Sequence, residues 1–428
     1  MANTQISPSG LLGGASAVSN EQNQLWRGRV WTGHHGAQAF IEDGVVEVSA
    51  GHIRSVREAR LTDPVAETDQ HGSPYTFLPG MVDLHNHGGA GHSFPTSGIA
   101  GCRTAAAHHQ SRGTTTMLAS LVSAEGPALI GQAAVLAQLA DEEVIAGIHL
   151  EGPFLSSRRC GAHDPAALSP ADPELLTGIA EASRGHLRSV TIAPEVDRFQ
   201  EVVTICAEYG VVVSLGHSDA TAAQTEAALS VAEEFGVRVS ATHLFNAMPT
   251  MHHRDPGIAG ALLRAASASR VVAELVADGV HLDDTTVDIA LAAAPNHVAF
   301  VSDAVAAAGE VDGSYTLGAA QVRVDHGVAR LSAASSPPGS GQGPLAGGTS
   351  SLVDQLLRHA GTGLVCGTIE SVESLTRGAR AVRACTRTPA DVLGLHDRGV
   401  LAAGYRADVV RLDSQGHVAG VLDQSRRQ

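Results

Sequence analysis

The sequence predicts an α/β protein built on a (β/α)8 TIM-like barrel, with a small β-sandwich domain formed from both chain ends. Short β-branched apolar runs alternate with Ala-rich stretches through the middle of the chain, which is the pattern of parallel strands joined by helices. Eight such runs span about 225 residues, close to the roughly 250 residues typical of this barrel. Strand-like segments with glycine turns flank them on both sides.

The elements are expected in the following order. Residues 1–22 are polar and unpatterned and predict a disordered tail. Residues 23–76 and 396–428 are predicted to form the small β-sandwich domain, and 77–395 the barrel. The predicted barrel strands are 77–85, 114–122, 144–152, 189–194, 211–217, 238–245, 270–278 and 298–304. Residues 305–348 then predict a hairpin and a Gly/Pro/Ser-rich loop at 332–348, which is either a loop near the site or a surface insertion.

Charge and composition exclude several classes of function. A net charge of −16 disfavours nucleic acid and anionic membranes as partners, and 3% aromatic residues disfavour a base-stacking surface. All 28 basic residues are Arg. The lack of lysine excludes Schiff-base catalysis, a P-loop and a carboxylated-lysine bridge between two metals.

The cysteines and the hydropathy pattern bear on location. Five cysteines are widely spread without a C-x-x-C pair, so a reducing cytoplasm is expected. We find no signal peptide in the first twenty residues and no apolar run near the ~20 residues that span a bilayer.

Imidazole and carboxylate side chains gather at the carboxyl ends of the predicted strands, where barrel active sites form. A mixed set of His and carboxylate ligands with room for water is what a catalytic Zn²⁺ or a similar ion requires. A single histidine at a strand end is more often a hydrogen-bonded structural residue, but a whole set in this placement favours a metal site. The set is His85, His87, Glu151, His217, His243 and Asp303. The histidines predicted to be structural or on the surface are His108, His109, His252, His253, His326 and His359.

Six segments carry a resemblance to a known family: PGMVDLHNHG, HLEGPF, LGHSDAT, THLFNAM, ADGVHL and VSDAVAAAG. HLEGPF followed by THLFNAM is more discriminating than the HxH pattern that many amidohydrolases share. Over about residues 25–421 the chain resembles the N-acetylglucosamine-6-phosphate deacetylases of the amidohydrolase superfamily. The resemblance implies a barrel beside a β-sandwich, and metal-dependent hydrolysis of N-acetylglucosamine-6-phosphate to glucosamine-6-phosphate and acetate.

Carried over position by position, the resemblance implies that Glu151, His217 and His243 are the principal metal ligands and that Asp303 is the catalytic acid and base. His85 and His87 stand where some members lack histidines and hold one metal, whereas others keep them and can hold two. One or two divalent ions per subunit are therefore expected, zinc first, with iron, cobalt or manganese as alternatives.

The resemblance also implies the substrate contacts. Asn246 and Ala247 fall on the segment that contacts the sugar, and His163 is a further substrate contact. Arg254 and His281 match residues that meet the phosphate. In related members the neighbouring subunit supplies a phosphate ligand, which implies a homodimer.

Alternatives stay open at this point. Another amidohydrolase acting on a different N-acyl or cyclic amide, or a non-catalytic barrel scaffold, would share the fold. Glucosamine and galactosamine phosphates are not distinguished, and Cys160 is assigned no role.

Overall fold

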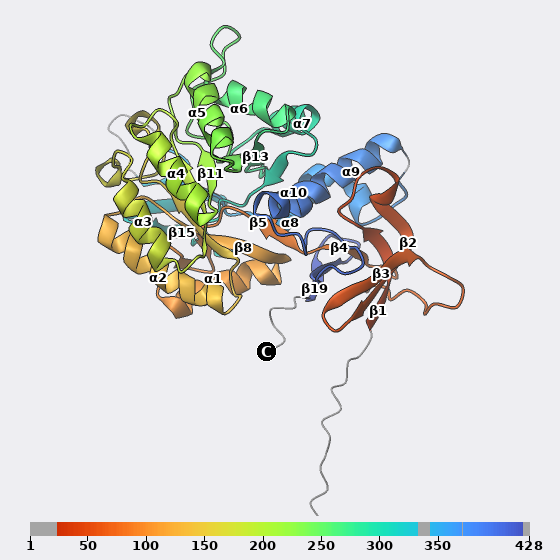
Figure 1. Ribbon diagram of the computed structural model, residues 1–428. Helices are drawn as coiled ribbons and strands as arrows, with labels where there is room; N and C mark the ends of the chain where they lie inside the picture. Colours follow the sequence, from red (N-terminus) through yellow and green to blue (C-terminus); the bar gives the residue numbers. More distant parts are fainter. Residues whose placement is uncertain (1–23, 333–342, 370, 423–428) are drawn as a thin grey trace, which may run out of the picture.

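The computed structural model describes residues 24–332, 343–369 and 371–422. Figure 1 shows a strand barrel wrapped in helices and, beside it, a smaller sheet in which the two ends of the chain meet. The expected tail at 1–22 and most of the loop at 332–348 lie outside the described residues.

Eight parallel strands form the barrel in the order β14-β13-β12-β11-β10-β9-β8-β5. They close just past the strand ends, where Asp303 N donates to His85 O and His87 N donates to Ala304 O. All eight predicted barrel strands therefore have a counterpart in this sheet, the first of them over only part of its predicted length. Their bounds are β5 Met81–Asp83, β8 Thr114–Leu121, β9 Gly147–Glu151, β10 Leu187–Ile192, β11 Val212–Leu215, β12 Val239–Ala241, β13 Val272–Leu275 and β14 Val298–Phe300.

Helices alternate with these strands, and their starts follow local capping chemistry. Asp172 and Asp283 accept hydrogen bonds from backbone N–H groups of the first turns of α3 and α7, and Thr221 forms a capping box with Gln224 at the start of α5. The bounds are α1 Ile99–Ser111, α2 Gly126–Asp141, α3 Pro173–Ala182, α4 Phe199–Tyr209, α5 Ala222–Glu234, α6 Gly257–Ser267 and α7 Asp284–Ala293.

Both chain ends contribute to one six-stranded sheet, in the order β19-β18-β4-β1-β2-β3, which confirms a small β domain built from the termini. The expected strand 77–85 is divided between the two bodies. Residues 77–79 belong to β4 and pair with β1 and β18, whereas β5 begins the barrel after Gly80. The strands are β1 Gln24–Trp31, β2 Phe40–Ser49, β3 His52–Glu58, β4 Thr76–Pro79, β18 Val409–Leu412 and β19 Val418–Leu422.

Three further helices, α8 Leu352–Ala360, α9 Val372–Cys385 and α10 Arg387–Val392, lie between the barrel and the end sheet (Figure 1). The buried Trp31 joins the two parts: its Nε1 donates to Leu364 O at 3.0 Å. Gly378 of α9 faces the ring so closely that a Cβ would lie 2.4 Å from Trp31 Cη2. The close approach of helix and ring therefore requires glycine at this position.

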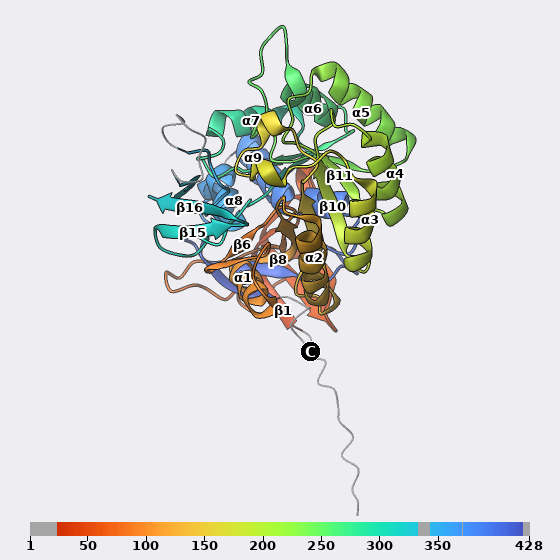
Figure 2. The ribbon, with the colours of Figure 1, turned by 90° about the vertical axis from the view of Figure 1, so that its left-hand side faces the viewer.

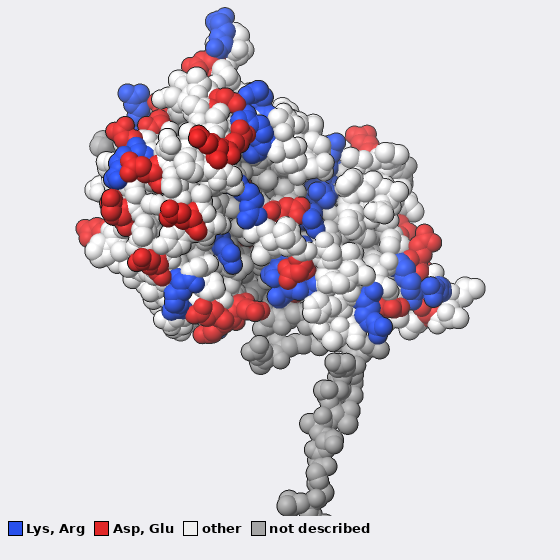
Figure 3. Space-filling model, viewed as in Figure 1, with Lys and Arg blue, Asp and Glu red and all other residues white. Residues whose placement is uncertain are grey.

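The insertion after β14 forms a three-stranded antiparallel sheet, β15 Gly313–Leu317, β16 Ala320–Asp325 and β17 Val328–Leu331, where a hairpin was expected. Figure 2 shows β15 and β16 at one side of the barrel, away from α4 and α5. No described helix combines the length and apolar character needed to cross a membrane. Figure 3 shows arginines and acidic residues interspersed over one face, without a broad basic area.

Candidate metal centre and active site

The carboxyl ends of six barrel strands bring the predicted ligands to one place. His85 and His87 follow β5, Glu151 is the last residue of β9, and Asp303 follows β14. His217 follows β11, and His243 follows β12. His281 follows β13. The first six of these residues are at most 8% exposed, and the side chain of His281 is 4% exposed. Residues as far apart as 85 and 303 therefore share one buried centre, as the strand-end placement predicts.

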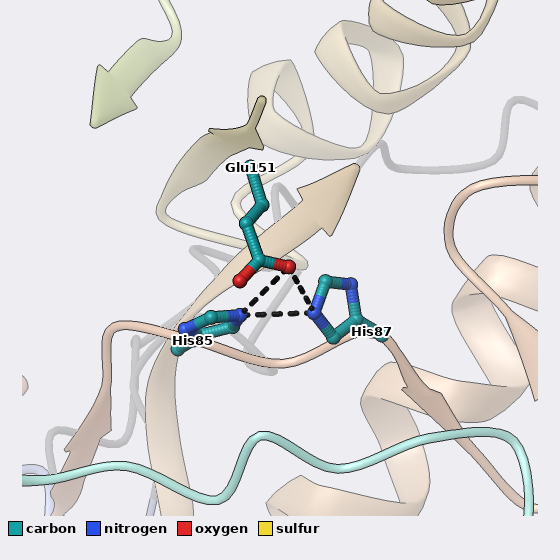
Figure 4. A group of neighbouring side chains, drawn as sticks. All are labelled: His85, His87 and Glu151. Atoms are coloured by element: carbon teal, nitrogen blue, oxygen red, sulfur yellow. Dashed lines mark hydrogen bonds and ion pairs between the residues drawn. The ribbon is translucent and has the colours of Figure 1, made fainter. Parts of the chain in front are cut away.

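The carboxylate of Glu151 is the middle of this centre. Its Oε1 lies 3.0 Å from both His217 Nε2 and His243 Nε2. Its Oε2 lies 3.2 Å from His87 Nε2 and 3.5 Å from His85 Nε2, as the dashed lines in Figure 4 mark. One carboxylate thus serves two imidazole pairs, one through each oxygen.

Asp303 stands beside the second pair. Its Oδ1 lies 3.5 Å from His85 Nε2 and 3.4 Å from His87 Nε2, and its Oδ2 lies 3.9 Å from His281 Nε2. The Asp303 carboxylate therefore faces both the predicted ligands and His281.

The arrangement of ring nitrogens fits a divalent metal. His85 Nε2 and His87 Nε2 lie 2.9 Å apart, and His217 Nε2 and His243 Nε2 lie 3.1 Å apart. Nitrogen lone pairs that converge on carboxylate oxygens are stabilised by a shared cation, and imidazole with carboxylate is a donor set for zinc and its neighbours. Two buried groups meet the geometry of a metal site, His85–His87–Glu151 and Glu151–His163–His217, and they share Glu151.

Backbone carbonyls fix two of the rings for this role. His217 Nδ1 lies 2.9 Å from Arg159 O and His87 Nδ1 lies 3.2 Å from Ser120 O. A carbonyl only accepts, so each ring donates from Nδ1 and turns Nε2 toward the centre, where its lone pair becomes available to a metal once Nε2 carries no proton.

The electrostatics of the centre call for positive charge. Burial disfavours the ionised form of Glu151, yet the imidazoles, His85 and His163 foremost, hold its pKa well below the usual range. Burial likewise opposes ionisation of Asp303, and His85 and His87 outweigh it, so the pKa of Asp303 is lowered. In return, although burial opposes its protonation, hydrogen bonds to Asp303 and Glu151 raise the pKa of His87 to about 10. Two buried carboxylates thus draw a proton onto an imidazole, and a bound cation would satisfy the same demand.

The backbone at three of these residues is strained. His217, His243 and Asp303 have φ values of +47°, +27° and +46°, a region that residues with a Cβ rarely adopt. Such conformations persist where the surroundings over-determine them, and they concentrate at functional sites. This feature has no signal in the sequence.

A cavity of about 720 Å³ opens over the centre. His163, Asn246, Ala247 and His281 all line it, as do Asp303 and four of the five predicted ligands. Arg254 does not: it is exposed on the segment 249–256, which projects above α5 and α6 (Figure 1) and carries basic and acidic side chains at its tip (Figure 3).

Two acidic residues escaped the sequence analysis. Glu274 of β13 is buried inside the barrel, 3.9 Å from His85 Nδ1, and burial raises its pKa to about 7. Asp278 Oδ2 lies 2.9 Å from His281 Nδ1 and orients that ring. The sequence does carry a signal for each. Glu274 is a single acid within an apolar strand, and Asp278 lies three residues before a predicted substrate histidine.

Five of the histidines predicted to be structural or on the surface lie in such positions. His109 is buried and its Nε2 lies 2.8 Å from Gly88 O, and the buried His359 Nε2 lies 3.0 Å from Ala277 O. Both are structural. His252, His253 and His326 are exposed.

Residues 76–425 match the amidohydrolase family. An N-acetylglucosamine-6-phosphate deacetylase of Bacillus subtilis is 31% identical over 388 residues, covering 88% of this chain and 91% of that one. An N-acetylgalactosamine-6-phosphate deacetylase of Escherichia coli is 29% identical and covers 90% of this chain and 95% of its own.

Among solved structures, a mutant N-acetyl-D-glucosamine-6-phosphate deacetylase from Mycobacterium smegmatis, in complex with N-acetyl-D-glucosamine-6-phosphate, superposes with a TM-score of 0.80. It is 33% identical, and the match covers 94% of this chain and 98% of that one. Together with the buried His and carboxylate centre at the barrel mouth, these matches show that the chain belongs to the amidohydrolase family and, within it, to the N-acetylglucosamine-6-phosphate deacetylases.

Proposed function

We propose that the chain hydrolyses the acetamide of N-acetylglucosamine-6-phosphate to glucosamine-6-phosphate and acetate, in amino-sugar catabolism or recycling. The observation that carries the proposal is the shared Glu151 carboxylate, which joins two imidazole pairs at the floor of a cavity large enough for a phosphorylated sugar.

The metal is proposed to be zinc, with iron, cobalt or manganese as alternatives. His217 and His243 would hold one ion with Glu151, and His85 and His87 a second, which supports two ions per subunit. When bound, the metal lowers the pKa of water and polarises the amide carbonyl.

Asp303 is proposed to move the proton. Its pKa is lowered by His85 and His87 against the effect of burial, so the carboxylate is ionised at neutral pH and able to accept a proton from the attacking water. It returns that proton to the amine nitrogen as the C–N bond breaks. The acetyl carbon keeps the water oxygen and leaves as acetate.

His163 has the tautomer of a hydrogen-bond donor. Ser123 N donates to its Nδ1 at 3.3 Å, so the neutral ring carries its proton on Nε2, beside Glu151. That N–H is placed to stabilise the negative charge that develops on the carbonyl oxygen.

His281 is proposed to meet the phosphate. Burial lowers the pKa of His281, but the carboxylates of Asp278 and Asp303 raise it by more. The pKa is therefore raised overall, which favours the cationic ring. Asn246 and Ala247, which line the same side of the cavity after β12, are proposed to contact the sugar.

Arg254 is proposed to reach the phosphate of a neighbouring copy, which would make the functional form a homodimer. No arginine lines the cavity among the described residues, while the exposed segment 249–256 projects away from its own subunit. An isologous dimer would place each such segment over the partner's cavity.

Cys102, Cys206 and Cys385 are buried as free thiols, which supports our proposal of a cytoplasmic location. The Escherichia coli relative supports N-acetylgalactosamine-6-phosphate as a second candidate substrate.

The test combines elemental analysis of the purified protein with acetate release from both phosphorylated sugars. We expect one to two equivalents of metal and the higher kcat/KM with the glucosamine derivative. Faster release from the galactosamine derivative would assign the second candidate. Metal without acetate release from either sugar would refute both.

A further inference from the structure

The cavity has two sides of different chemistry. The sugar side carries Asn246, Ala247 and His281, which follow β12 and β13. The other side, called here the apolar lobe, carries aliphatic side chains contributed by the end of β8, by α2 and by the insertion sheet. The lobe consists of Leu121, Val122, Ala128, Leu129, Leu317 and Ala320.

The strand order places these sides opposite each other. In the closed barrel, β8 is four strands from β12 in either direction, so the two strands lie across the mouth from one another. The centre around Glu151 and Asp303 lies between them. An amide that is held over this centre with its sugar on the β12 side therefore directs its acyl carbon toward the lobe.

The lobe is a formed pocket wall. Val122 and Leu317 belong to one apolar cluster, and a Cβ at Gly318 would lie 2.8 Å from Val122 Cγ2, so the β15–β16 turn packs directly on the barrel. Gln132, which also lines the cavity, is already engaged because its Nε2 donates to Phe94 O and Ser97 O. Glu125 stands exposed at the rim.

An acetyl group offers one methyl to this wall, in which Ala128 and Ala320 are the most open positions and the four larger side chains are at most 8% exposed. We infer that the apolar lobe is an acyl-chain subsite, so that the chain hydrolyses N-acylated glucosamine-6-phosphates with acyl groups longer than acetyl, of four to six carbons. This inference rests on the proposed function, whose reaction it keeps: water oxygen joins the acyl carbon, the C–N bond breaks, and the amine takes the proton. Each further methylene buried in the lobe contributes up to about a four-fold gain in binding.

The experiment compares kcat/KM for N-acetyl-, N-butanoyl- and N-hexanoyl-glucosamine-6-phosphate with the metal-loaded enzyme. We expect the longer substrates to fall within about ten-fold of acetyl, with KM decreasing along the series. Acetyl hydrolysis accompanied by a loss of more than about a hundred-fold for both longer chains would overturn the acyl subsite and leave the proposed function intact. If no substrate is hydrolysed, the proposed function fails as well.

Two variants test whether the longer acyl chain binds in the apolar lobe. Ala128→Phe on α2 and Ala320→Phe on β16 each fill the lobe from a different element, and each should lower the hexanoyl-to-acetyl ratio of kcat/KM by about ten-fold or more. Gln138→Phe, an exposed position of α2 outside the cavity, is the matched control and should keep the ratio. Equal losses for both substrates in the two lobe variants would contradict the inference.

Discussion

At the level of single residues, Glu151 has the most demanding position. Each carboxylate oxygen faces a different imidazole pair, and the side chain is 4% exposed. A neutral replacement would remove the charge that both pairs share and would place an amide N–H₂ against imidazole nitrogens. The two proposed ions consequently depend on one side chain.

Glu151→Gln should therefore lose most of its metal and at least about a hundred-fold in activity, since even partners outside the ligand set typically cost about 10–100-fold. Metal content by elemental analysis and acetate release should fall together. Glu234→Gln, an exposed position on α5, is the control. Full metal content in Glu151→Gln would remove this residue from the ligand set.

Asp303→Asn separates proton transfer from binding. Asparagine keeps the size of the side chain but cannot accept the proton of water, so kcat should fall by about 10²-fold or more while the substrate still binds. Steady-state kinetics and substrate binding by calorimetry check both parts, with the exposed Asp325→Asn as control. Near-normal turnover would mean that another group moves the proton.

The sequence could predict the ligand candidates because strand ends converge at a barrel mouth, a rule that needs only the strand positions. It could not predict that Glu274 faces His85 or that Arg254 lies outside the cavity. Those facts depend on strand register and loop direction, which are set by tertiary packing.

At the level of elements, all eight barrel strands could be predicted because buried parallel strands form continuous apolar runs. The division of 77–85 between β4 and β5 could not, because both halves are buried and apolar and periodicity is the same in each. The third strand of the insertion, β17, is short and partly exposed, and it left a weak signal.

The contact between α9 and the end sheet provides an element-scale prediction. Alanine is the better helix former by about 1 kcal/mol, but a Cβ at Gly378 would press on the Trp31 ring, and overpacking typically costs about 1–3 kcal/mol. Gly378→Ala should therefore lower the free energy of unfolding, measured with urea. Arg377→Ala, on the exposed face of the same helix, should not. Equal or higher stability of Gly378→Ala would show that the ring can move aside.

At the level of the whole molecule, the projecting segment 249–256 makes the proposed dimer testable by complementation. Arg254→Ala should reduce kcat/KM for the phosphorylated sugar roughly ten- to a hundred-fold and spare the unphosphorylated one. Co-expression of Arg254→Ala with Asp303→Asn should restore about a quarter of wild-type activity, because half of the dimers then hold one complete site of two. If Arg254 instead acts within its own subunit, no site in the mixed dimers will be complete. Co-expression will then give no more activity than the two variants give separately.

Buried neutral histidines also predict the pH dependence of stability. Burial lowers the pKa of His109 to about 4, against an ordinary value of 6.5. The neutral His109 ring therefore costs no stability above about pH 6.5. As the pH falls from there toward 4, the unfolded chain binds a proton that the folded one does not, and the free energy of unfolding decreases, by about 2 kcal/mol at pH 5. His109→Gln keeps a donor for Gly88 O but cannot be protonated, so its urea midpoint should change less between pH 7 and pH 5. The exposed His253→Gln should follow the wild type; a matching slope in His109→Gln would assign the loss elsewhere.

The left-handed backbone at His217, His243 and Asp303 places function and stability in opposition. Each such conformation costs on the order of 1–3 kcal/mol in a residue with a Cβ, and glycine would adopt it freely. Glycine at any of the three positions would relieve this strain but would remove a side chain of the centre, so the barrel could gain stability while losing its chemistry.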